Sequence, residues 1–148
     1  MKIDRATAAD VEAISELLGE IEAYYGGDPA PVDVDQVRQA LFGDPPAASV
    51  LLARGDDGDV LGMASYTRLW PASGADTSLY LKELFVRERA RRQGVAAALM
   101  ERLKEEAAAL GCSRLEWTAD QDNPPALRFY EALGMQQHTG KTFYRLGL

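Results

Sequence analysis

The spacing of hydrophobic residues predicts four helices. In each of them apolar side chains recur every three or four positions, which places them on one face of a helix. Thr7, Asp33 and Asn123 stand at the start of three of these segments, where their side chains would accept hydrogen bonds from free backbone N–H groups. The predicted helices cover residues 7–25, 33–43, 94–110 and 123–134.

Six further segments have the alternation of polar and apolar residues, or the short apolar runs, that are typical of strands. They cover residues 3–6, 48–54, 60–70, 78–86, 113–119 and 141–148. The Gly-Asp-Asp-Gly-Asp stretch between the second and the third favours a hairpin. There are no repeats and no linker, so the sequence predicts one α/β domain over residues 1–148, built around a mixed sheet.

The composition narrows the class of protein. Of the 148 residues, 47% are apolar and 26% are charged, which is ordinary for a globular domain. No apolar run is long enough to cross a membrane, and the N-terminus lacks the pattern of a signal peptide, so we expect a cytoplasmic protein that does not enter a membrane. The single cysteine excludes an internal disulfide, and one cysteine with one histidine offers no metal-binding cluster.

Charge is distributed unevenly along the chain. The net charge of −7 argues against nucleic acid as a partner, because binding a phosphate backbone requires a basic face, and it is compatible with a cationic substrate. Against this acidic background, four arginines and one glutamate give residues 87–92 a charge of about +3.

This basic segment precedes Gly94, at the predicted start of a helix. The first N–H groups of a helix have no acceptor within it and lie at the positive end of its dipole, so they form an anion site. Gly94 permits a sharp turn and the close approach of a bulky anion, and Ala96 keeps the next position clear. On charge alone, a solvated basic turn is the alternative. The glycine motifs of P-loops and of dinucleotide folds are absent.

The strand before this turn changes its phase. Leu79 and Leu81 share one face, whereas Leu84 and Val86 have the opposite parity. One extra residue near positions 82–83 would return all four leucine and valine side chains to a common face, as a β-bulge does. The alternative is a strand that is buried on both faces, because the residues between them include apolar ones as well.

Two motifs follow this strand in order. Residues 91–96 match Q/R-x-x-G-x-G/A, and residues 123–135 match N-x-x-A-x-x-F-Y-x-x-x-G-F/M. Together with the strand 78–86, they resemble the GCN5-related N-acetyltransferase (GNAT) superfamily over nearly the whole chain. The resemblance implies an α/β fold of the α+β type, in which a mixed, mostly antiparallel sheet has helices on both faces. It also implies a cleft where the strands 78–86 and 113–119 splay apart.

The resemblance implies acetyl-CoA as the donor. Amides of the glycine turn would hold its pyrophosphate with help from an arginine, and the pantetheine arm would pair with the end of the strand like an additional strand. The start of the helix 123–134 would line the other side of the cleft. These implied contacts fall on Leu84, Phe85, Val86, Arg91, Arg92, Gln93, Gly94, Val95, Ala96, Asn123 and Ala126.

Two side chains are candidates for proton transfer. By resemblance, Tyr130 is the general acid that protonates the departing thiolate, which a phenol of pKa about 10 can do for a thiol near 8.5. Taken in isolation, Tyr130 would be an ordinary core tyrosine. The acceptor amine must lose a proton before it attacks, and Glu83, beside the predicted bulge, is the candidate to take it directly or through water. A structural ion pair is the alternative role for Glu83. By the same resemblance, a backbone N–H near the bulge would stabilise the oxyanion.

The chain is similar, within the superfamily, to the branch that acetylates diamines, polyamines and thialysine. That branch has YLEDLFV where this chain has YLKELFV, so Lys82 replaces an acid and would repel a dication. The acceptor expected here is therefore a smaller amine, or one whose own carboxylate Lys82 could bind. Glu22, Tyr25 and Asp120 are the other expected pocket residues.

The sequence thus favours an acetyl-CoA-dependent N-acetyltransferase whose small primary amine substrate attacks directly in a ternary complex. Two alternatives stay open, namely a protein or peptide acceptor and a non-catalytic acyl-CoA-binding module. By analogy with single-domain enzymes of this kind we expect a homodimer, in which the C-terminal strand would pair or exchange.

Overall fold

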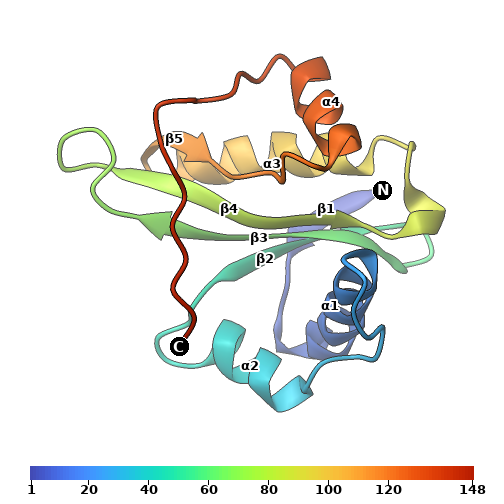
Figure 1. Cartoon of the computed structure of the whole chain (residues 1–148). Coiled ribbons are helices and arrows are strands. Elements are labelled where there is room, and N and C mark those ends of the chain that lie inside the picture. The colour runs from blue at the N-terminus through green and yellow to red at the C-terminus, as the bar shows by residue number, and fades with distance from the viewer. The chain divides into compact units, whose positions relative to one another are not determined.

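Five strands form one sheet in the computed structural model, which describes residues 1–148 (Figure 1). The strands are β1 (Lys2–Arg5), β2 (Ser49–Arg54), β3 (Val60–Leu69), β4 (Thr77–Val86) and β5 (Cys112–Glu116). The helices are α1 (Val11–Tyr24), α2 (Val34–Phe42), α3 (Val95–Ala109) and α4 (Pro124–Ala132), with short 3-10 helices η1 (Ala8–Asp10) and η2 (Glu88–Ala90). None of the helices combines the length and the apolar character that crossing a membrane requires.

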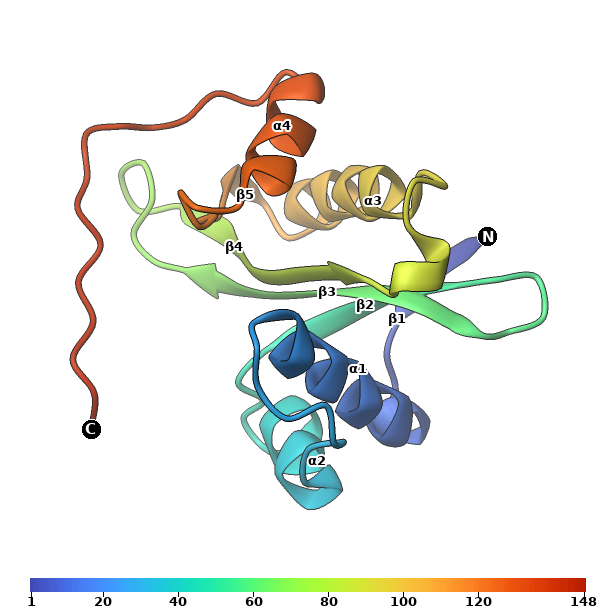
Figure 2. The ribbon, with the colours of Figure 1, turned by 45° about the vertical axis from the view of Figure 1, so that its right-hand side comes forward.

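The sheet keeps the order of the sequence, β1-β2-β3-β4-β5. Neighbouring strands from β1 to β4 are antiparallel, and β5 runs parallel to β4. Helices α1 and α2 cover one face of the sheet and α3 covers the other (Figure 2). The mixed, mostly antiparallel sheet with helices on both faces confirms the predicted fold class.

The chain divides into two compact units. The first, Met1–Trp117, contains the whole sheet and helices α1 to α3, and the second, Thr118–Leu148, contains α4 and the C-terminal segment. The first unit holds the hydrophobic core, whereas no residue of α4 is buried. The single domain expected from the sequence stays a prediction.

Side-chain caps set the helix starts where the sequence predicts them. The Thr7 N–H donates to Asp10 Oδ2 (2.8 Å) and the Thr7 hydroxyl accepts from Ala9 N (3.3 Å), so the capping box is present. It opens the 3-10 turn η1, which leads directly into α1. Asp33 caps α2 by accepting from the amides of Asp35 and Gln36.

Apolar side chains of α1 pack on the sheet and form the core on that face. Its buried members come from α1, α2 and strands β2 to β4: Val11, Ile14, Leu17, Ile21, Val37, Val50, Leu52, Val60, Met63 and Phe85. On the opposite face, Leu99 and Leu103 of α3 are fully buried. The helical spacing of apolar residues therefore predicted the inner faces of both helices.

A buried carboxylate ties α3 to the sheet. Glu106 is 4% exposed, accepts a hydrogen bond from the Tyr66 hydroxyl (3.1 Å) and from Arg5 Nε (3.1 Å), and forms an ion pair with Arg102 (2.6 Å). Burial by itself would raise the pKa of Glu106. The hydrogen bonds from Arg5 and Tyr66 and the neighbouring charges outweigh burial, so the pKa of this carboxyl lies below its usual value.

Replacing this carboxylate should destabilise the fold in a pH-dependent manner. We expect Glu106→Gln to lower the free energy of unfolding by about 2 kcal/mol at neutral pH. Because the folded-state pKa is depressed, the contribution of the carboxylate is complete above the unfolded value of 4.5 and is lost as the pH falls through the folded value. Urea unfolding of both proteins at pH 7 and near pH 3 measures this, and an equal difference at both pH values would contradict it.

The predicted strand at residues 141–148 is wrong for the single chain. Residues 135–148 contain no helix or strand, and every residue from 136 onward is exposed. A strand needs a hydrogen-bonded neighbour, and the sheet order ends at β5, so no other strand of this chain pairs with the segment. The strand β5 is also shorter than predicted, because it ends at Glu116.

Candidate active site

The predicted bulge lies in the middle of β4. Ser65 of β3 is opposite Glu83, but the next residue, Tyr66, is opposite Leu81, so Lys82 has no partner of its own. This confirms the predicted bulge. Because β4 has one extra residue, the side chains of four residues lie on one face of the sheet, as predicted: Leu79, Leu81, Leu84 and Val86. Phe85 is buried on the other face, so this part of β4 is apolar on both sides as well.

The bulge places the two charged residues of β4 differently. Glu83 is half-buried and shares its sheet face with Phe85, because their partners on β3 are Ser65 and Met63. This is the face that α1 covers. Lys82, by contrast, is exposed, and its ammonium group forms no ion pair.

The strands β4 and β5 part just before the bulge. Their pairing runs from Thr77 opposite Cys112 to Tyr80 opposite Glu116 and then ends, while β4 continues to Val86. One edge of β4 is therefore without a strand neighbour over residues 81–86, as the predicted splay requires. An unpaired edge of this kind offers backbone donors and acceptors to an extended ligand.

The glycine turn leads into α3 in a left-handed conformation. Gly94 has φ 81° and caps the helix, and Arg92 has φ 60°. The first hydrogen bond of the helix runs from Ala98 N to the Gly94 carbonyl (3.0 Å), so the amides of residues 94–97 have no acceptor within the helix. Residues 91–94 of the turn are exposed, whereas Val95 is buried, so an anion can approach this end of the helix from the side of the turn.

Two of the four arginines in the turn are neutralised by carboxylates from other elements. Arg87 contacts Glu16 (3.2 Å) and Glu20 (3.1 Å) of α1, and it also lies 3.9 Å from Asp59 of the β2–β3 hairpin. Its Nε is close to Glu20 but makes no hydrogen bond, so the contact with Glu20 is electrostatic. Arg89 also pairs with Asp59. The free charge of the turn is therefore smaller than the sequence indicated.

The remaining two arginines have different surroundings. The Arg91 guanidinium lies over the rings of Tyr24 (5.4 Å) and Phe85 (5.6 Å), and its Nε donates to the Val86 carbonyl (3.0 Å). Arg91 thus fixes the end of α1 against the end of β4. Arg92 is exposed and pairs with no carboxylate, so its charge is available to an anion at the turn.

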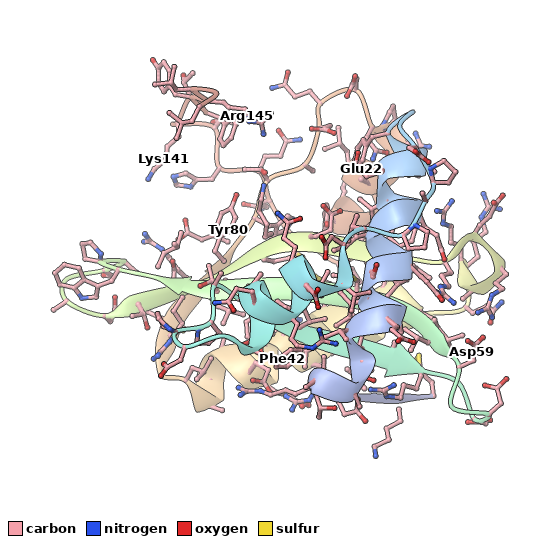
Figure 3. All side chains as sticks on the ribbon, turned by 90° about the horizontal axis from the view of Figure 1, so that it is seen from below. Glu22, Phe42, Asp59, Tyr80, Lys141 and Arg145 are labelled. Carbon is pink, nitrogen blue, oxygen red and sulfur yellow. The ribbon has the colours of Figure 1, made fainter.

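The end of α1 supplies the other predicted pocket residues of the first unit. Tyr25 is 58% exposed and its ring is stacked edge-on against Tyr24 (5.1 Å). Glu22 is exposed in the last turn of the helix (Figure 3). Sequence reasoning did not name Tyr24 as a site residue. The centroids of its ring and of the Phe85 ring lie 6.5 Å apart. The place of Tyr24 in the apolar stripe of α1 was the available signal.

The remaining predicted residues belong to the second unit. Asn123 caps α4 by accepting from Ala126 N (3.3 Å), with prolines in the first turn of the helix, as predicted. Tyr130 is half-buried, and its ring is stacked edge-on with Phe129 (5.1 Å). Asp120 is exposed in the loop before the helix. The roles of these residues in the cleft stay predictions.

Comparison with known proteins assigns the family. The chain matches the Acetyltransferase (GNAT) family over residues 12–135, which span both units, and it belongs to that family. It is thus an N-acetyltransferase, of a family that uses acetyl-CoA as co-substrate. An integron cassette protein from the mobile metagenome of V. cholerae has the same fold, with a TM-score of 0.85 and 33% identity over 99% of this chain and 91% of its own.

Several curated relatives have small-molecule amines in their names. Aminoglycoside N(6')-acetyltransferase type 1 of Serratia marcescens is 34% identical over 68% of this chain and 70% of its own length. Thialysine N-epsilon-acetyltransferase of Bos taurus is 27% identical over 93% of this chain and 85% of its own. L-ornithine N5-acetyltransferase of Arabidopsis thaliana is 31% identical over 63% of this chain, and the match spans only 41% of that protein.

Proposed function

We propose that this protein transfers the acetyl group of acetyl-CoA to the primary amine of a small molecule, by direct attack within a ternary complex. The observation that carries the proposal is the unpaired edge of β4 beside the open amides of α3. The unpaired strand edge suits an extended arm that contains amides, and the helix amides suit a pyrophosphate. The named substrates of the relatives support a small amine. We also propose that the enzyme acts as a homodimer.

The residues of the first unit fit the donor. Residues 84–86 of β4 would pair with the pantetheine arm, and the amides from Gln93 to Ala96 would hold the pyrophosphate. Arg92 would add a charge-assisted contact to this anion, whereas Arg91 would act by holding the turn in place. When bound, the donor supplies a thioester whose carbonyl carbon accepts the amine.

The two arginines should differ when each is replaced by alanine. We expect Arg92→Ala to raise the KM for acetyl-CoA about tenfold, the loss of one charged contact, with little change in stability. Arg91→Ala should instead lower the free energy of unfolding by about 1–2 kcal/mol, because two ring contacts and one hydrogen bond are lost. Steady-state kinetics and urea unfolding measure both effects. If both variants changed the KM for acetyl-CoA and the free energy of unfolding to the same extent, the two arginines would not have different roles.

Proton transfer is assigned to two side chains. Glu83 would take a proton from the acceptor ammonium, directly or through a water molecule, so that the amine can attack. As the nitrogen–carbon bond forms and the carbon–sulfur bond breaks, Tyr130 would donate its phenolic proton to the sulfur. The second proton that the nitrogen loses as it becomes an amide would leave to solvent, and solvent would restore the proton of the phenol. A backbone N–H of β4 next to the bulge would donate to the carbonyl oxygen as that oxygen gains negative charge.

Lys82 favours an acceptor that carries its own carboxylate. It is an unpaired, exposed ammonium group next to Glu83, so an α-amino acid could bind with its carboxylate on Lys82 and its amine toward Glu83. A polyamine would meet a like charge at the same place. Glu22, Tyr25 and Asp120 are proposed as the remaining pocket residues. Thialysine and ornithine, named for two relatives, are amino acids of this kind.

Thiol release from acetyl-CoA tests the proposal. Purified protein would be assayed with lysine, thialysine, ornithine, diaminopropane, spermidine, an aminoglycoside and a short peptide. We expect the amino acids to have the highest kcat/KM, and Lys82→Glu to shift the preference toward the diamine. Lys104→Glu reverses the charge of an exposed lysine on α3 and is the control. Turnover of the peptide alone would favour a protein acceptor, and silence across the panel would favour a non-catalytic acyl-CoA-binding module.

A further inference from the structure

Four half-buried polar side chains lie together on the face of the sheet that carries α1. Ser65 of β3 is directly opposite Glu83 of β4, and Thr67 is directly opposite Tyr80. Because alternate residues of a strand point to the same side and the bulge adds one residue to β4, both pairs lie on the face that Phe85 occupies. Residues directly opposite one another have Cβ atoms about 5 Å apart, and the two pairs are about 7 Å apart along β3. These four residues form one contiguous polar patch.

The apolar core beneath α1 ends next to the polar patch. Met63 and Phe85, the neighbouring pair on the same face, are buried members of that core. All four residues of the polar patch are instead half-buried. Figure 3 views this face of the sheet and shows Tyr80 of β4 and Glu22 at the end of α1. The polar patch is therefore partly screened from water without being part of the core.

The three hydroxyl groups of the polar patch have no partner within the chain. The side chains of Ser65, Thr67 and Tyr80 make no hydrogen bond to another residue. Arg87 Nε is the single buried side-chain polar atom without a hydrogen bond, so the three hydroxyl oxygens are in contact with water. A ligand that covered them with methylene groups would leave them buried and unpaired, which is costly. A ligand with hydroxyl groups could replace the lost water, because a hydroxyl both donates and accepts hydrogen bonds.

The charge of the polar patch is confined to one end. Glu83 is its one carboxylate, and the three residues that carry hydroxyls are neutral. A carboxylate attracts an ammonium group, whereas neutral hydroxyls select hydrogen-bonding groups irrespective of charge. An acceptor whose nitrogen lies at Glu83 would therefore extend its uncharged part over Thr67 and Tyr80, the pair about 7 Å further along the sheet. This distance is within the reach of a small molecule.

We propose that Ser65, Thr67 and Tyr80 determine the specificity for the acceptor, and that they select an amine with a hydroxyl group near its nitrogen over an amine with a bare methylene chain. The inference rests on the proposed function, because it takes Glu83 as the group that meets the acceptor nitrogen. The hydroxyl of the acceptor would donate to one of the three oxygens and accept from another. A bare chain would take water from the same oxygens and return no hydrogen bond, so the site would discriminate against it.

Two amines that differ by one hydroxyl test the selection. 1,3-Diaminopropane and 1,3-diamino-2-propanol have the same length and the same two amino groups, and the hydroxyl is equally near both nitrogens. The quantity measured is the ratio of kcat/KM for the hydroxylated amine to kcat/KM for the bare one. We expect this ratio to be about tenfold lower in the double variant Thr67→Val/Tyr80→Phe than in the wild type. The hydroxyl also makes the amine less basic, and comparing the same two amines in both proteins cancels that effect.

Both substitutions keep the size of the side chain and suit a strand, and the two single variants measure each hydroxyl separately. Ser49→Ala is the control, because it removes a half-buried hydroxyl from β2 opposite Tyr66, whose side chain points to α3 on the other face. Its ratio should equal that of the wild type.

The outcomes separate the inference from the proposed function. If the ratio were unchanged in Thr67→Val/Tyr80→Phe, or if both kcat/KM values fell to the same extent, the inference would be overturned while the measured turnover left the proposed function intact. If no amine of the panel were acetylated, the proposed function would be overturned and the inference with it.

Discussion

Replacing Tyr130 with phenylalanine is expected to lower kcat by about 10²–10⁴-fold, the range that a lost general acid produces. The KM for acetyl-CoA should change little, because the ring and its stacking on Phe129 are retained. The reason is chemical: without the phenol, the sulfur leaves as a thiolate with no proton donor. Steady-state kinetics with acetyl-CoA and the best amine of the panel measures the loss.

The leaving group distinguishes an acid from a merely structural tyrosine. With 4-nitrophenyl acetate as the donor, the leaving group needs no proton. The ratio of the wild-type kcat to that of Tyr130→Phe should therefore fall toward one. Tyr144→Phe, a conservative change at an exposed tyrosine, is the control and should keep full activity. If Tyr130→Phe retained more than about a third of the wild-type kcat, Tyr130 would not be the acid.

Replacing Glu83 with glutamine is expected to lower kcat/KM by about 10²-fold or more. The amide keeps the shape of the side chain and its place in the bulge of β4 but cannot take a proton. At neutral pH a lysine-like amine is almost entirely protonated, so the loss should be greatest for such amines. The rate of the variant should rise with pH over the whole measured range, because the free amine must then come from solution.

Acceptors of low pKa test this interpretation. An amine such as aminoacetonitrile is largely unprotonated at pH 7, so the wild type and Glu83→Gln should differ much less with it than with lysine. Glu12→Gln, an exposed change in the first turn of α1, is the control for the loss of one carboxylate. A defect of equal size for every amine would show that Glu83 positions the strand rather than moving a proton.

The sequence alone determined the features that depend on neighbours in the chain. The caps Thr7, Asp33 and Asn123 act within three residues of their own position, so side-chain chemistry was sufficient to predict them. The bulge of β4 could be predicted because a shift in the alternation of apolar residues records which face is buried. The left-handed conformation of Gly94 could be expected because glycine, which has no Cβ, adopts it at low cost.

Only the tertiary structure decided which charges and edges remain available. Arg87 is paired by Glu16 and Asp59, which are far from it in sequence, and nothing in the spacing of residues 87–92 could distinguish it from the unpaired Arg92. The C-terminal strand was predicted from its composition but has no partner in the chain, because strand formation depends on a neighbour that the strand itself does not encode. Long-range pairing decides both outcomes, and local sequence carries no record of it.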